Sequence, residues 1–105
     1  MLREQTFLIL AAVTPVPLHG YGILKTVEEL SDGRVHLRAG TLYAALDRLV
    51  GSGSLQLDHE EIVDGRLRRY YRITHDGLAV LRQEVERLEA NAAVAHRQLR
   101  RVGLA

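Results

Sequence analysis

The segment from Arg38 to Ile73 limits the possible folds more than any other part of this sequence. In residues 39–52 the apolar side chains recur with helical spacing, and a hairpin pattern follows directly. The apolar side of this helix, which we expect in the core, carries Leu42, Leu46, Leu49 and Val50. The opposite side carries small or polar residues: Gly40, Thr41, Ala44, Arg48 and Gly51. Such small residues lower helix stability but allow another molecule to approach the backbone.

The hairpin has a preferred register. A three-residue loop, Val63-Asp64-Gly65, sets Leu57 against Tyr71 and Leu55 against Ile73 and leaves one apolar face, whereas a two-residue Asp64-Gly65 turn would mix the faces. The three-residue loop also predicts that Glu60 lies across from Arg68. The outer face then carries Arg66, Arg68, Tyr70 and Arg72.

The rest of the chain reads as helices and one short strand. We expect a first helix over residues 3–14, ended by prolines, and a second over residues 20–30. The inner side of the second helix carries Ile23, Leu24, Val27 and Leu30. Residues 35–37 suggest a short strand, and Thr74 is the expected N-cap of a last helix, with Asp76 in its first turn.

The last helix has an uninterrupted heptad seam, formed by Leu78, Leu81, Val85, Leu88, Ala92, Ala95, Leu99 and Val102. At ~1.5 Å per residue the helix is about 40 Å long, and so small a chain cannot cover that length itself. We therefore expect the seam to pair two copies. We expect the first helix to complete the dimer interface through Phe7, Leu8 and Leu10.

Composition excludes several classes of protein. The 105 residues suit one modest core, and the lack of cysteine rules out disulfides and thiolate metal sites. The apolar run 7–13 is too short to span a bilayer and does not resemble a signal peptide, so we expect a cytoplasmic protein. The five histidines lack ligand spacing, and no nucleophile, phosphate loop or carboxylate pair suggests catalysis. We expect no metal, no cofactor and no enzymatic activity.

Three motifs in order resemble the signature of PadR-type transcriptional regulators. They are His19-Gly20-Tyr21-Gly22-Ile23-Leu24, then Gly40-Thr41-Leu42-Tyr43 with Leu46, Arg48 and Leu49, then Arg69, Tyr71-Arg72-Ile73-Thr74 and Gly77. The single C-terminal helix is similar to that of the shorter subfamily. The resemblance implies an α+β fold, mainly α: a winged helix-turn-helix with a two-stranded wing over residues 1–74 and a dimerisation helix over residues 75–105. It also implies a homodimeric repressor whose affinity for its operator changes with a small-molecule effector.

The residues expected to contact DNA lie in three places. The third helix and the residue before it supply Arg38, Gly40, Thr41, Tyr43, Ala44 and Arg48; the start of the second helix supplies His19, Tyr21 and Lys25; the wing supplies Arg66 and Arg68. A small-faced helix suits a major groove, and arginines beside it suit phosphates. Some of these side chains have structural alternatives: His19 could cap a turn, and Tyr43 could pack against Tyr21.

Two other functions remain open on the residues alone. A winged helix can dock on an acidic partner protein without acting on DNA, and a dimer cavity can bind a small molecule as its main function. If the chain does act on DNA, the pairing of two copies predicts an inverted-repeat operator.

Overall fold

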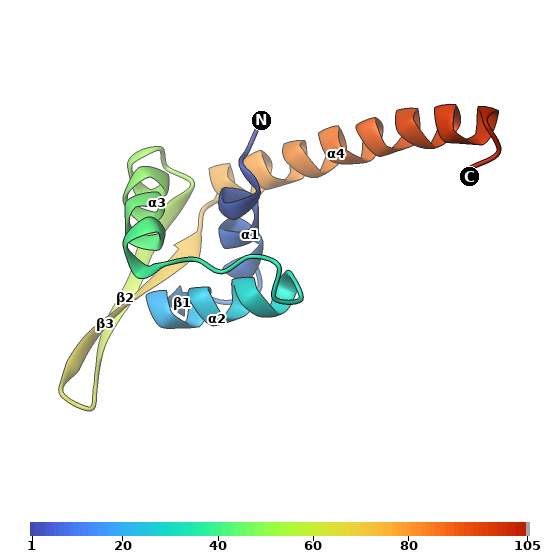
Figure 1. Ribbon diagram of the computed structural model, residues 1–105. Helices are drawn as coiled ribbons and strands as arrows, with labels where there is room; N and C mark the ends of the chain where they lie inside the picture. Colours follow the sequence, from blue (N-terminus) through green and yellow to red (C-terminus); the bar gives the residue numbers. More distant parts are fainter. Residues whose placement is uncertain (105) are drawn as a thin grey trace.

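The computed structural model describes residues 1–104, which form four helices and a three-stranded sheet whose hairpin extends away from the helices (Figure 1). The helices are α1 (Glu4–Ala12), α2 (Gly20–Leu30), α3 (Ala39–Gly51) and α4 (His75–Arg101). The strands are β1 (Leu18–His19), β2 (Leu55–Val63) and β3 (Arg66–Ile73), in the order β1-β3-β2. The predicted fold class, a winged helix with a long C-terminal helix, is confirmed.

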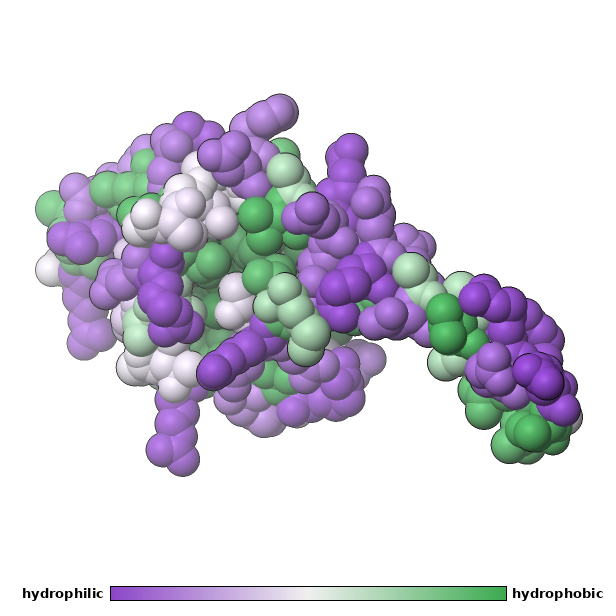
Figure 2. Space-filling model, turned by 90° about the horizontal axis from the view of Figure 1, so that it is seen from above, coloured by the Kyte–Doolittle hydropathy of each residue, from purple (hydrophilic) through white to green (hydrophobic). Residues whose placement is uncertain are grey.

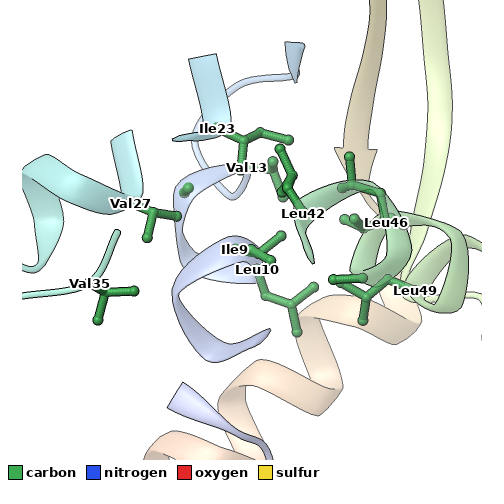
Figure 3. Close-up of a cluster of buried hydrophobic side chains, with 12 residues drawn as sticks. Ile9, Leu10, Val13, Ile23, Val27, Val35, Leu42, Leu46 and Leu49 are labelled. Carbon is green, nitrogen blue, oxygen red and sulfur yellow. The ribbon is translucent and has the colours of Figure 1, made fainter. Parts of the chain in front are cut away.

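The core lies where α1, α2 and α3 meet (Figure 3). Its fully buried side chains include Ile9, Leu10, Val13, Ile23, Val27, Leu42 and Leu46. Each contributes about 1.5–3 kcal/mol by leaving water. This core fixes the angle between α2 and α3 and thereby decides which side of α3 remains free.

The core corrects three expectations from the sequence. Leu10 was expected in a dimer interface, but it is 0% exposed and belongs to the core of the protomer. Leu30 and Val50 were expected in the core, but they are 53% and 41% exposed because each falls in the last turn of its helix, at the rim of the packed region.

The expected strand at residues 35–37 does not form. Ser31, which is buried, holds this segment as a loop. Its hydroxyl donates to the Glu28 carbonyl (3.2 Å) and accepts from the Val35 N–H (3.1 Å). The loop still buries Val35 in the core, so an apolar residue here signals packing rather than sheet pairing.

The wing turns through two residues rather than three. Val63 pairs with Arg66, and both Asp64 (φ 52°) and Gly65 (φ 74°) adopt the positive φ that a tight hairpin turn requires. The predicted pairs Leu57–Tyr71 and Leu55–Ile73 nevertheless form, because a bulge between Leu57 and His59 absorbs the extra residue. Beyond the bulge the predicted pairing is wrong.

Helix α4 begins against the turn between α3 and β2. The Thr74 hydroxyl accepts from the Gly77 N–H (3.0 Å), as the sequence predicts, and donates to the Ser54 carbonyl (3.1 Å). The Ser54 carbonyl also accepts from the Thr74 N–H (3.0 Å). Gly77 is packed so closely against Ser54 that a side chain there would overlap its carbonyl oxygen.

A buried carboxylate joins α4 to the N-terminus of the chain. Glu84 is 6% exposed, accepts from the Leu2 N–H (3.3 Å) and forms an ion pair with Arg87. The hydrogen bond from Arg87, and then that from Leu2, lower the pKa of Glu84 to about 2 despite its burial. The carboxylate therefore remains charged at neutral pH and holds the chain start against α4.

The distal part of α4 projects away from the other elements (Figures 1 and 2). Every residue from Leu88 to Leu104 is exposed, and the molecule measures 60 × 28 × 21 Å. Apolar side chains nevertheless gather on this part (Figure 2): Leu88, Val94, Leu99 and Val102. Exposed apolar side chains on a projecting helix are typical of a protein–protein interface.

Candidate nucleic-acid interface

Helix α3 turns a polar, small-residue side outward. Leu42, Ala45, Leu46 and Leu49 fill the core, and this fixes the rotation of the helix. The exposed side carries the predicted Gly40, Thr41, Ala44 and Arg48. Asp47 also lies on this side and was not included among the predicted contact residues, although the helical spacing alone places it there.

The start of α2 lies beside this side of α3. The His19 Nδ1 atom accepts from the Gly22 N–H (3.4 Å) and so caps the helix. Tyr21 is 69% exposed and so does not pack in the core. Its ring stacks on that of His19, with centroids 6.4 Å apart, and Lys25 is exposed one turn further along α2.

Gly20 allows α2 and α3 to approach closely. A Cβ atom at Gly20 would lie only 2.5 Å from the Tyr43 hydroxyl oxygen. Tyr43 therefore packs on the α2 backbone while half of its side chain stays exposed. Tyr43 can therefore pack against α2 and still reach a phosphate, because its hydroxyl lies at the boundary between the two helices.

Ion pairs divide the wing arginines into two groups. Arg69 contacts Glu60 (3.1 Å) and Arg72 contacts Asp58 (3.6 Å). The predicted pairing of Glu60 with Arg68 is wrong, because the bulge shifts the register by one and sets Glu60 opposite Arg69. Within residues 1–104, Arg66 and Arg68 form no ion pair.

Aromatic rings cover the outer face of the sheet. Tyr70 stacks on His59 at 4.3 Å and meets the edge of His19 at 5.2 Å. Burial under these rings lowers the pKa of His19, and the positive charge of Arg68 lowers it further, against a smaller opposite effect of Glu61. A lowered pKa keeps His19 neutral, which its role as a hydrogen-bond acceptor at the helix cap requires.

A groove of about 630 Å³ lies between α3, the start of α2 and the wing. Tyr43 and Asp47 line it from α3, and Tyr21 lines it from α2. On the wing side it is lined by Arg66, Leu67, Arg68, Arg69 and Tyr71. Five predicted residues therefore line this groove: His19, Tyr21, Tyr43, Arg66 and Arg68.

A smaller groove of about 380 Å³ lies on the other flank of α3. It runs between the start of α1 and the predicted residues Gly40, Thr41, Ala44 and Arg48. Arg3, just before α1, and Thr6 of α1 line it, and neither was predicted as a site residue. Arg38, the residue before α3, is exposed, and no carboxylate of the described chain pairs with Arg3, Arg38 or Arg48.

The expected dimer-interface residues differ in exposure. Leu78, Val85, Leu88 and Leu99 are each between 37% and 43% exposed, Val102 is more open, and Ala92 and Ala95 are exposed. Leu8 and Leu81 instead pack partly on the protomer's own core, and Phe7 is half-buried. The uncovered part of the seam thus begins beyond the first turns of α4.

Residues 1–104 lack two further features, a metal-binding cluster and a membrane-spanning helix. No cluster of three or more His, Asp or Glu side chains could hold a metal ion there. None of the helices in this part of the chain is both long enough and apolar enough to cross a membrane.

Transcriptional regulators are among the known proteins that resemble this chain. The model of the transcriptional regulator PadR-like family matches residues 9–83. The transcriptional regulator Rv3488 of Mycobacterium tuberculosis is 42% identical over 62 residues, which make up 59% of this chain and 57% of that protein. The match therefore spans little more than half the length of that relative.

Two solved structures share the fold. A transcriptional regulator from Clostridium thermocellum has a TM-score of 0.75 and 27% identity, over 88% of this chain and 89% of its own. PadR of Bacillus subtilis, determined in complex with operator DNA, has a TM-score of 0.70 and 20% identity, over 79% of this chain and 47% of its own. At that identity the second likeness concerns the fold alone.

Proposed function

This chain belongs to the PadR-like family of transcriptional regulators, and on that premise we propose that it binds an operator as a homodimer and represses transcription. The observation that carries the proposal is the position of the unpaired arginines. Arg48 lies on the small-residue side of α3, and Arg66 and Arg68 lie on the wing, across one groove from α3. A protein that needed these arginines only for solubility would have no reason to group them around a small-faced helix.

In this proposal α3 enters the major groove. Its small side allows the backbone to approach the base edges, where Thr41 and Arg48 have polar atoms to offer, and Arg48 suits the acceptor edge of a guanine. Arg66 and Arg68 bind phosphates beside that groove, and Tyr21 and Lys25 contact the flanking backbone. A protein of the same fold, PadR of Bacillus subtilis, has been determined in complex with operator DNA, which supports DNA as the partner.

Two copies pair through α4. Residues 1–74 form the DNA-binding domain, and α4 is the dimerisation helix, whose exposed apolar side chains support this division; of the expected segment 75–105, residue 105 lies outside the described residues. Pairing sets two α3 helices about one helical turn of DNA apart, so the operator is an inverted repeat. An effector that changes the relative position of the two copies would release the operator.

A gel shift with the DNA upstream of the chain's own coding region tests the proposal. Binding should be stronger than to random duplex and should weaken steeply as salt rises. A complex with a partner protein, together with equal affinity for both duplexes, would instead support the protein-docking alternative. Deleting residues 92–105 should give monomers in sedimentation, and an unchanged dimer would contradict the assignment of α4.

The wing arginines offer a matched pair of variants. Replacing Arg66 and Arg68 with Ala should reduce the slope of log K against log salt by about 2, since two phosphate contacts are lost. Replacing Arg69 and Arg72 should reduce it less, because Glu60 and Asp58 already neutralise them. Equal effects of the two double variants would show that the ion pairs do not select the DNA-binding arginines.

A further inference from the structure

Asp47 lies near the middle of the exposed side of α3. At 3.6 residues per turn it is about 20° around the helix from Gly40 and about 40° from Gly51, with Ala44 one turn before it. It is exposed and lines the groove shared with Arg66, Arg68 and Arg69. It is the one acid on this side of the described helix.

Asp47 has no structural partner in the described chain. It forms no ion pair or hydrogen bond there, whereas other acids close to arginines do: Glu60 binds Arg69, and Asp58 binds Arg72. Tyr71 lines the same groove as Asp47; burial raises the pKa of the Tyr71 hydroxyl, Arg69 lowers it, and the charge of Asp47 adds to the rise. A role in stability therefore does not explain an aspartate at this position.

A carboxylate that faces DNA is repelled by phosphates, so it is unfavourable there unless it accepts a hydrogen bond from a base. In the major groove the cytosine amino group is such a donor, and aspartate is among the side chains that accept from it. Aspartate is short, so it reaches a base edge only where its neighbours are small. Gly40, Ala44 and Gly51 meet that condition.

We propose that Asp47 is a base-specificity residue of the operator-binding surface and accepts a hydrogen bond from a cytosine amino group in each half-site. The inference rests on the proposed function, because it requires α3 to lie in the major groove. It gives this position an acceptor-only group, whereas the guanidinium of Arg48 has no acceptor atom and the hydroxyl of Thr41 can both donate and accept.

The test is selection of bound duplexes from a random pool by the full chain and three variants. The wild type should enrich a motif with cytosine at one position of each half-site, preferred about tenfold over other bases. D47N should move that preference to adenine, which asparagine binds through two hydrogen bonds. D47A should lose the preference and bind random duplex more tightly, because a negative charge near the phosphates is gone.

The matched control is E86Q, which removes one negative charge from an exposed position on α4. It should enrich the wild-type motif. The same motif with the wild type and D47N would overturn the assignment of Asp47 while leaving the proposed function intact. A wild-type selection without any enriched motif would instead overturn both, so the two failures are distinguishable.

Discussion

Replacing Gly77 with Ala tests whether α4 is held rigidly against the rest of the fold. An added Cβ would overlap the Ser54 carbonyl oxygen and lie 2.8 Å from Cγ1 of Ile73. Comfortable contacts between carbon atoms are about 3.5–4.0 Å, so the start of α4 must move away by a substantial fraction of an ångström or more. That movement also stretches the hydrogen bonds by which Thr74 and Ser54 join the two segments.

The expected loss of stability follows from three terms. Overpacking costs about 1–3 kcal/mol, and a weakened Thr74 cap costs about 1 kcal/mol. The better helix propensity of alanine returns about 0.5–1 kcal/mol. The free energy of unfolding should therefore fall by about 1–3 kcal/mol, which in urea shifts the midpoint of unfolding by roughly 1 M.

Urea unfolding at one fixed protein concentration measures this, because association of the proposed kind would make stability depend on concentration. The control is Gly51→Ala, where no atom outside the immediate helix lies within 4 Å of the added Cβ. That variant should be as stable as the wild type or slightly more so. If Gly77→Ala behaved in the same way as the control, the close contact with Ser54 would not hold α4 in place.

Three further variants probe single groups. His19→Asn keeps the cap of α2 but cannot titrate. Because the pKa of His19 is lowered in the folded state, the stability that its cap contributes is complete above about pH 6.5 and is lost at lower pH. The melting temperature of the variant should therefore depend less on pH between 7 and 5 than that of the wild type. Glu84→Gln should likewise reduce the loss of stability between about pH 4.3 and 2. The Arg87 hydrogen bond lowers the pKa of Glu84, so the stability that this carboxylate contributes is lost only as pH falls through that range. An unchanged pH profile in either variant would contradict the role assigned to its side chain. Ser31→Ala leaves the buried Val35 N–H without its acceptor and should lower the free energy of unfolding by about 1–3 kcal/mol in urea, whereas a neutral effect would mean that water replaces the hydroxyl.

The sequence predicts the parts of this fold that depend on periodicity. Helix α2 has the expected bounds, Thr74 caps α4 as expected, and the spacing of leucines in α3 identifies its exposed side. These features depend on local spacing and capping, which a single segment contains. Asp47 could have been found by the same means, since it recurs with Gly40, Ala44 and Gly51 on that side.

Features that depend on contacts between distant segments were not predictable. The bulge after Leu57 is one, because alternation along β2 fits an ordinary ladder with a longer turn equally well. The two-residue strand β1 is too short to show a pattern, and it forms because β3 lies beside it. Glu84 looks like one more solvated acid of a charged helix, and only the position of Leu2 shows that it is buried.

The tight joint at Gly77 has a geometric consequence for a dimer. Helix α4 has 27 residues and extends about 40 Å at ~1.5 Å per residue. Over that length, a tilt of about 5° at the joint would displace α3, relative to the far end of α4, by roughly 3.5 Å. That displacement is close to the rise of one base pair, ~3.4 Å. If two copies pair through α4 as proposed, the close packing at Gly77 would therefore help to set the distance between the two half-sites of the operator.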